Sequence, residues 1–483
     1  MSGSFKAKTV SALSWSLIQE FSQRGLQLAI GILLARLLGP KEFGLVAMLA
    51  IFFAVAQSLV ESGFGSALIQ RKELTIADEC SVFYFNVFAG LCLACFLCLV
   101  APLIAGFYHQ NLLTSLTRVW SVVLVINSFG VVQSALMVRE LNFKGQAVIS
   151  VMSTGVSGAL GLSLAWGGWG VWSLVWQQIT FSSVRAGLLW LLNAWRPRWL
   201  FSFPSLREMF GFGSGMVAAS LVDTLFDNLY SVAIGKLYTP VTLGFYNRAY
   251  TFQDIASRLL SAIANRVTFP VFSQLQHDSA RLKRGLQKAM TTLAFAQFPL
   301  MIGLAVVARP MVLLLLGEKW EPCIPYLQLL CFAGLFYPMH LLNLNVLMAR
   351  GRSDLFFRLV LIRRALVVVN IVTTFRWGVL AMVWGQVIIS VVSYFVNSYY
   401  TKRFADYSIP EQLRDVCPYL TASIVMGIVV ALVNLPLPAG HVAQFSLKVC
   451  TGAIVYWAIC CGFHLPALGE IMAIIRRRTA VPA

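Results

Sequence analysis

The stretch WGVWSLVWQQ at residues 169–178 recurs as WGVLAMVWGQ at residues 377–386, with six of the ten residues identical. Shared apolar composition readily produces chance matches of Leu, Val and Gly, but it does not readily place the pattern WGVxxxVWxQ twice in one chain. Two such copies, 208 residues apart, therefore indicate an internal duplication.

Two further pairs of segments match in the same order along the chain. They are RLLGPKEFGLV at 36–46 with KLYTPVTLGFY at 236–246, and LMVR at 136–139 with LMAR at 347–350. In the first pair, Pro40 and Gly44 fall on Pro240 and Gly244. The offset between copies changes along the chain, as small insertions in loops would cause.

The composition identifies the solvent around these segments. The chain has 483 residues, of which 58% are hydrophobic and 12% are charged, and its mean hydropathy is +0.77. A soluble domain carries about 25% charged residues and could not cover this much apolar surface. The composition therefore predicts an all-α polytopic membrane protein and excludes a soluble enzyme, a disordered chain and a secreted disulfide scaffold.

Fourteen segments are long enough to cross a bilayer as helices, which requires about 20 apolar residues. They lie near 10–37, 43–66, 81–107, 113–137, 147–166, 170–193, 209–235, 243–269, 289–316, 323–348, 356–376, 378–400, 416–436 and 443–464. Each copy of the duplication holds six of them, which predicts two six-helix lobes related by a parallel internal repeat, plus two extra C-terminal helices. The expected parts are an N-terminal lobe at 1–194, a basic cytoplasmic linker at 195–208, a C-terminal lobe at 209–403, and the extra helices with a basic tail at 404–483.

The basic residues predict the orientation of the chain in the membrane. Twenty-two Lys and Arg residues fall in one set of loops and about four in the opposite set. Because cytoplasmic loops carry the excess of positive charge, both termini of this even-numbered array are predicted to lie in the cytoplasm. Topology and attraction to anionic lipid therefore explain the net charge of +18 without nucleic-acid binding.

Two predicted spans carry a polar stripe at helical spacing. The stripes are Ser16, Glu20, Gln23, Arg24 and Gln27 in the first span, and Ser220, Asp223, Thr224, Asp227 and Asn228 in the seventh. Four positions of the first stripe match four of the second at an offset of 200, so the polar face belongs to the duplication. Because ionisable groups at bilayer depth usually face a cavity or a partner, we expect both stripes to line a shared central cavity.

The expected cavity assigns roles to particular residues. The substrate-binding candidates are Glu20, Gln23, Arg24, Gln27, Arg248, Asp254 and Arg258, and the ion-coupling candidates are Asp223, Asp227 and Glu61. Carboxylates at i, i+4, such as Asp223 and Asp227, can share a proton or an alkali cation. Alternatively, Arg24 and Arg258 form purely structural pairs within their helices, and Arg248 reaches a membrane surface.

Motifs of enzymes and metalloproteins are absent from the sequence. It contains no GxxxxGKS phosphate loop, no HExxH and no GxSxG, and its five histidines are dispersed. The longest hydrophilic segments, near 195–208, 270–288 and 401–415, are too short for a catalytic domain. We therefore expect no enzymatic activity, no metal and no cofactor, with H⁺ or Na⁺ as the coupling ion if transport is coupled.

Three motifs resemble those of a known group of membrane proteins. They are Ser22, Arg24 and Gln27, the segment ARLLGPKEFG at 35–44, and the segment ESGFGSALIQR at 61–71. With these motifs the chain resembles the polysaccharide transporter branch of the multidrug/oligosaccharidyl-lipid/polysaccharide exporter superfamily, particularly the colanic-acid and teichuronic-acid exporter-type proteins. The resemblance implies a cationic central cavity with arginines on the first and eighth helices, where Arg24, Arg248 and Arg258 lie.

The resemblance also implies a function, location and partners. A flippase of this branch moves an undecaprenyl-diphosphate-linked oligosaccharide repeat unit across the bacterial inner membrane for exopolysaccharide, O-antigen or capsule-type biosynthesis, by alternating access of its two lobes. Its partners are the lipid-linked oligosaccharide, the bilayer and other polysaccharide-assembly membrane proteins. The alternatives are a cation-coupled multidrug exporter, which favours an acidic, aromatic cavity, and a membrane glycan polymerase or ligase, which needs a large periplasmic loop.

Overall fold

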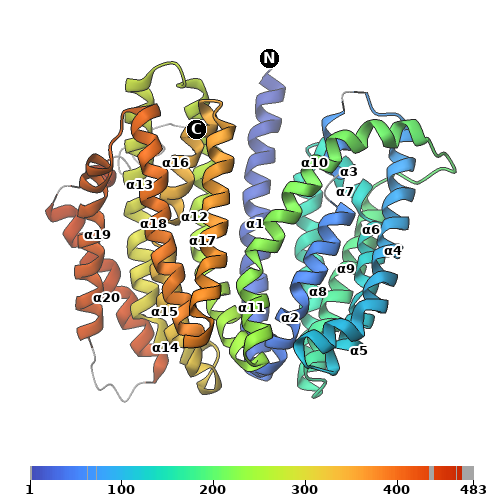
Figure 1. Ribbon diagram of the computed structural model, residues 1–483, viewed down its shortest axis with the longest axis horizontal. Helices are drawn as coiled ribbons and strands as arrows, with labels where there is room; N and C mark the ends of the chain where they lie inside the picture. Colours follow the sequence, from blue (N-terminus) through green and yellow to red (C-terminus); the bar gives the residue numbers. More distant parts are fainter. Residues whose placement is uncertain (1–2, 62–63, 72, 434–439, 464, 470–483) are drawn as a thin grey trace. The chain divides into compact units, whose positions relative to one another are not determined.

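The structure, a computed structural model, describes residues 3–61, 64–71, 73–433, 440–463 and 465–469. Every regular element in these residues is a helix, which confirms the all-α class predicted from the sequence (Figure 1). Contacts divide the chain into two compact units, Met1–Gly244 and Phe245–Ala483. The lobe and linker boundaries predicted from the repeat stay a prediction.

The first unit contains eleven α-helices and the start of a twelfth among its described residues. They are α1 (Gly3–Leu37), α2 (Pro40–Glu61), α3 (Phe64–Gln70), α4 (Ile76–Tyr108), α5 (Leu112–Trp120), α6 (Val122–Ser128), α7 (Val131–Arg139), α8 (Phe143–Trp166), α9 (Val171–Leu192), α10 (Phe203–Asp227), α11 (Leu229–Leu237) and the first residues of α12 (Pro240–Gln274). α8 packs against both α1 and α9, and α10 packs against α2, α3 and α4. Hydrogen bonds join two of these helix pairs. Gln19 of α1 donates to Ser150 of α8 at 3.2 Å, and the hydroxyls of Ser58 in α2 and Thr224 in α10 lie 3.2 Å apart.

The second unit contains the rest of α12 and the elements that follow it. These are α13 (Ser279–Val306), α14 (Ala308–Leu315), the 3-10 helix η1 (Glu318–Cys323), α15 (Ile324–Gly334), α16 (Tyr337–Ala349), α17 (Ser353–Thr374), the 3-10 helix η2 (Phe375–Trp377), α18 (Val379–Ala405), α19 (Ile409–Leu432) and α20 (His441–Gly462). α19 packs against α13 and α20. The Gln412 carboxamide of α19 is buried, accepts hydrogen bonds from Ser398 and Tyr394 of α18, and donates to the Tyr407 carbonyl. This buried polar network fixes α19, one of the two helices outside the duplication, against the unit.

Eight helical segments of the described residues are long and apolar enough to cross a membrane, and two bent helix pairs bring the number to ten. The bends measure 41° between α6 and α7 and 43° between α10 and α11. α1, α9, α12 and α17 overlap the remaining predicted spans, and charged side chains such as Arg24, Arg185 and Arg363 make these four helices less apolar. The chain is a multi-pass membrane protein, and the total of fourteen spans stays a prediction.

In both WGV copies the glycine has a positive φ and stands directly before a helix. Gly170 has φ 55° and precedes α9, and Gly378 has φ 93° and precedes α18. Only glycine adopts such a left-handed conformation without steric cost. The neighbouring Trp169 and Trp377 are exposed, as aromatic side chains at a membrane–water interface usually are.

The two LMxR copies also have matching contacts. Arg139 donates to the carbonyl oxygens of Leu68 and Arg71 at the end of α3, at 2.9 and 2.8 Å. Arg350 donates to the carbonyl oxygen of Phe404 at the end of α18, at 2.8 Å. Each arginine therefore binds the negative end of a neighbouring helix, where a cation is stabilising.

The third repeated motif brings its own two copies together within the first unit. A Cβ atom added to Gly44 would overlap the carbonyl oxygen of Pro240, and one added to Gly244 would overlap that of Pro40. Pro40 and Pro240 are the first residues of α2 and α12, a position that suits proline because its missing N–H needs no partner there. The two helix starts therefore approach each other reciprocally, and the glycines are required by that approach.

The segment between α9 and α10 lies along the first turns of α4. The side chain of Trp195 donates to Glu79 at 2.6 Å, and the backbone N–H of Ser202 donates to the Ser81 hydroxyl at 2.7 Å. α10 begins at Phe203, inside the predicted linker. The contacts of this segment make it part of the packed first unit.

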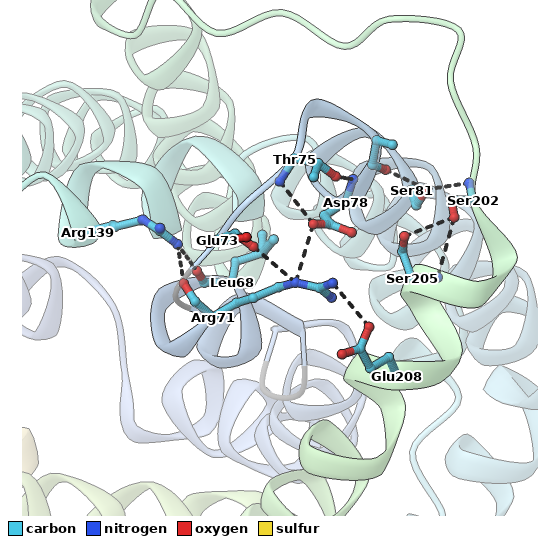
Figure 2. Close-up of polar contacts among 11 residues, drawn as sticks. Leu68, Arg71, Glu73, Thr75, Asp78, Ser81, Arg139, Ser202, Ser205 and Glu208 are labelled. Carbon is cyan, nitrogen blue, oxygen red and sulfur yellow. Dashed lines mark hydrogen bonds and ion pairs between the residues drawn. The ribbon is translucent and has the colours of Figure 1, made fainter.

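Arg71 connects this region to the start of α4 (Figure 2). Its guanidinium lies 3.4 Å from the carboxylate of Asp78 and 3.1 Å from that of Glu208 in α10. Asp78 is only 1% exposed and also accepts a 3.0 Å hydrogen bond from the Thr75 N–H in a capping box. Arg71 therefore compensates a buried carboxylate and joins α4 to α10, a role that the sequence pattern did not reveal.

Candidate functional site

The candidate residues of α1 lie midway along a 35-residue helix. The guanidinium of Arg24 lies 3.1 Å from the carboxylate of Glu20, and the two side chains are 35% and 25% exposed. Gln23 is also partly exposed, and Gln27 is exposed. The expected i, i+4 pair is therefore present, and its partial exposure leaves the guanidinium accessible.

The candidate residues of α10 lie near its C-terminal end. Asp223 and Asp227 are both exposed. Thr224, between them, contacts Ser58 of α2, so the helix is fixed on one side while the carboxylates remain accessible. Glu61, the third ion-coupling candidate, is the last residue of α2, and its side chain lies outside the described residues.

The candidates of α12 belong to the second unit and have two different environments. The guanidinium of Arg258 is 2.6 Å from the carboxylate of Asp254 and is 44% exposed. Arg248 is only 7% exposed, and its guanidinium lies over the ring of Trp320 at 5.7 Å from the ring centroid. The pair of Asp254 and Arg258 is accessible, whereas the packing of Arg248 favours a structural role for that residue.

The structure thus contains one accessible ion pair among the candidates of each unit. Glu20 with Arg24 and Asp254 with Arg258 are each paired within one helix. A guanidinium paired with one carboxylate still has N–H donors that can bind a phosphate oxygen. Each pair can therefore bind an anionic group while its carboxylate limits the net charge. That these residues contact a substrate stays a prediction.

The sequence pattern of a known family covers more than half of the chain. Residues 33–325 match the family described as polysaccharide biosynthesis protein. The chain belongs to this family. The resemblance predicted from the sequence is thereby confirmed. The motifs at 35–44 and 61–71 lie within the matched residues, whereas Ser22, Arg24 and Gln27 precede them.

Two named proteins of polysaccharide pathways match this family member along most of its length. It is 27% identical over 462 residues to the teichuronic acid biosynthesis protein TuaB of Bacillus subtilis, covering 94% of this chain and 95% of TuaB. It is 28% identical over 443 residues to the lipopolysaccharide biosynthesis protein WzxC of Escherichia coli, covering 88% of this chain and 89% of WzxC.

Solved structures establish the fold of this family member. The lipid II flippase MurJ in an inward closed conformation matches with a TM-score of 0.77 at 14% identity, covering 94% of this chain and 99% of MurJ. An inward-facing multidrug resistance transporter of the MATE family matches with a TM-score of 0.60 at 16% identity, covering 83% of this chain and 99% of that chain. The chain therefore has the fold shared by these two transporters.

Sequence reasoning gave no role to Arg185, a cation within a predicted span. Arg185 lies inside the predicted span 170–193, yet it was assigned neither to a loop nor to the cavity. It lines a pocket of the first unit together with residues of α3 and α7. Its position within an apolar segment was the available signal, because ionisable residues at that depth are costly.

Proposed function

We propose that this protein is a flippase that moves an undecaprenyl-diphosphate-linked oligosaccharide repeat unit across the bacterial inner membrane. The protein supplies a path for a headgroup that cannot cross hydrocarbon alone, and catalyses no covalent step. The full-length similarity to proteins of teichuronic acid and lipopolysaccharide biosynthesis supports a glycan cargo. The observation that carries the proposal is the accessible guanidinium of Arg24 midway along α1, in a chain of this family.

The chemistry of the cargo explains why arginines are suitable. A diphosphate is strongly hydrated, and each polar group that enters hydrocarbon without a partner costs several kcal/mol. A guanidinium offers two parallel N–H donors to phosphate oxygens and keeps its charge at every physiological pH. Arg24 and Arg258 would bind the diphosphate, and the carboxylates of Glu20 and Asp254 would keep the affinity low enough for release.

The proposal includes an orientation and an energy source. Both termini lie in the cytoplasm, as the distribution of Lys and Arg between loops predicts. The cargo enters from the cytoplasmic leaflet and leaves in the periplasmic leaflet, as the two lobes alternate access to a central cavity. H⁺ or Na⁺ binding at Asp223 and Asp227 would bias one of these states through a difference in affinity.

A deletion strain tests the proposed cargo. Loss of the gene should cause lipid-linked repeat units to accumulate on the cytoplasmic leaflet and should abolish the exported glycan, because their headgroup has no other route. The units are extracted and their sidedness is measured by access of a glycosidase in inside-out vesicles and in spheroplasts. Unchanged glycan export with increased drug sensitivity would contradict the proposal and favour the multidrug exporter.

A further inference from the structure

A pocket of about 190 Å³ lies within the first unit between α3, α7 and α9. Small residues leave this space open, among them Gly65 and Ser66 of α3, Ser134 of α7 and Ala186 of α9. The bend of 41° before α7 adds to the space, and Gly130 at that bend lines it. The volume is well above the roughly 10–15 Å³ that admits one water molecule, so a polyatomic group fits.

Arg185 brings a positive charge to this pocket. Within the part of the chain that the structure describes, its guanidinium makes no hydrogen bond or ion pair. The described lining includes no Asp or Glu, so the charge is not neutralised by the pocket itself. A guanidinium in such surroundings is costly unless an anion or water solvates it.

Two hydroxyl groups complete a set of donors. Ser66 and Ser134 both line the pocket and are partly exposed, and neither hydroxyl has a hydrogen-bond partner among the described residues. A planar guanidinium with hydroxyl donors on neighbouring helices is suited to a tetrahedral oxyanion, whose oxygens accept several hydrogen bonds at once. The donor set therefore selects a phosphate group rather than a cation or a neutral sugar.

The depth of Arg185 indicates where that phosphate comes from. Arg185 precedes the last residue of α9 by seven positions, about 10 Å along the helix axis. At the same end of the unit, Arg139 binds the end of α3 and Arg196 donates to the Trp190 carbonyl of α9 at 2.7 Å. Basic side chains at this end attract anionic lipid headgroups, and the guanidinium lies within reach of the headgroup layer.

We propose that the Arg185 pocket binds the phosphate group of a membrane lipid, at a site distinct from the residues assigned above to transport. An anionic phospholipid and a polyprenyl phosphate offer the same phosphate chemistry to this pocket. The bound phosphate neutralises Arg185 and joins α3, α7 and α9 through one ligand. The inference does not depend on the proposed function, because binding is measured without export.

The experiment measures lipid retained by the purified full-length protein in phosphatidylcholine nanodiscs. Phosphatidylglycerol or undecaprenyl phosphate is added in separate series, with inorganic phosphate as a third series, and bound lipid is counted by native mass spectrometry. Arg185→Gln should weaken binding of the retained lipid at least tenfold, because the charge and the paired donors are lost. Arg185→Lys should have an intermediate effect, and the double variant Ser66→Ala/Ser134→Ala a smaller one.

Arg118→Gln is the matched control, because Arg118 is an exposed cation of α5 outside the pocket, and it should retain lipid as the wild type does. The series with the larger effect identifies the phospholipid or the polyprenyl phosphate as the ligand. Equal lipid retention by the wild type and Arg185→Gln would overturn the proposal, as would binding of inorganic phosphate alone. If Arg185→Gln does not fold, the double serine variant decides in the same way.

Discussion

Gly44→Ala is expected to destabilise the protein by about 2–3 kcal/mol, even though alanine is the better helix former by about 1 kcal/mol. The added Cβ atom would overlap the carbonyl oxygen of Pro240, which is backbone and cannot rotate away. The two helix starts would have to separate, with loss of the packing around them. Gly244→Ala should have a similar effect, because its Cβ atom would overlap the carbonyl oxygen of Pro40.

The comparison is made by thermal unfolding of the purified variants in one detergent. Gly155→Ala in α8 is the matched control, because nothing lies within 4 Å of a Cβ atom at that position. The control should be neutral or slightly stabilising, since it gains helix propensity without a clash. A melting temperature of Gly44→Ala equal to or above that of Gly155→Ala would show that the close approach does not exist.

Arg24→Ala is expected to reduce glycan export about 10- to 100-fold while leaving the amount of protein in the membrane unchanged. A charge-assisted contact contributes about 1.5–3 kcal/mol, and each 1.4 kcal/mol corresponds to a factor of ten. Arg24 is partly exposed, so its removal leaves no cavity in a packed core. Exported glycan and membrane-bound protein are measured in the same complemented deletion strain.

Two other variants make the result specific: one separates the charge of Arg24 from its paired donors, and one is a control at another arginine. Arg24→Lys keeps the charge but loses the paired donors, so export should recover only in part. Arg118→Ala removes an exposed arginine of α5 that is no transport candidate, and export should stay at the wild-type level. Wild-type export by Arg24→Ala would remove this residue from the transport path.

The repeated motifs made the fold largely predictable, because each has a local physical cause. Glycine must occupy positions 170 and 378, where φ is positive, and the arginines at 139 and 350 bind helix ends in both halves. Such requirements act over a few residues and leave a readable pattern. The apolar runs likewise predicted where the helices lie, although the predicted span 113–137 is divided among the three short helices α5, α6 and α7.

The tertiary polar contacts could not be predicted in the same way. Arg71 meets Glu208 across 137 positions of sequence, and nothing near either residue specifies that contact. In the candidate site, helical spacing predicted the pairs of Glu20 with Arg24 and Asp254 with Arg258, because partners at i, i+4 share a helix face. Arg248 packs over Trp320, 72 positions away, so its burial could not be predicted from the spacing of residues along the helix.

The most direct test of the account is a flipping assay with the purified protein in liposomes. A polyprenyl-diphosphate oligosaccharide with a fluorescent sugar is placed in both leaflets, and a membrane-impermeant reductant then quenches the label that it can reach. Liposomes with the wild-type protein should lose nearly all fluorescence, whereas protein-free liposomes and those with Arg24→Ala should lose about half at first. Equal quenching in liposomes with and without the wild-type protein, with or without a proton or sodium gradient, would contradict the claim that this protein moves lipid-linked glycans across a bilayer.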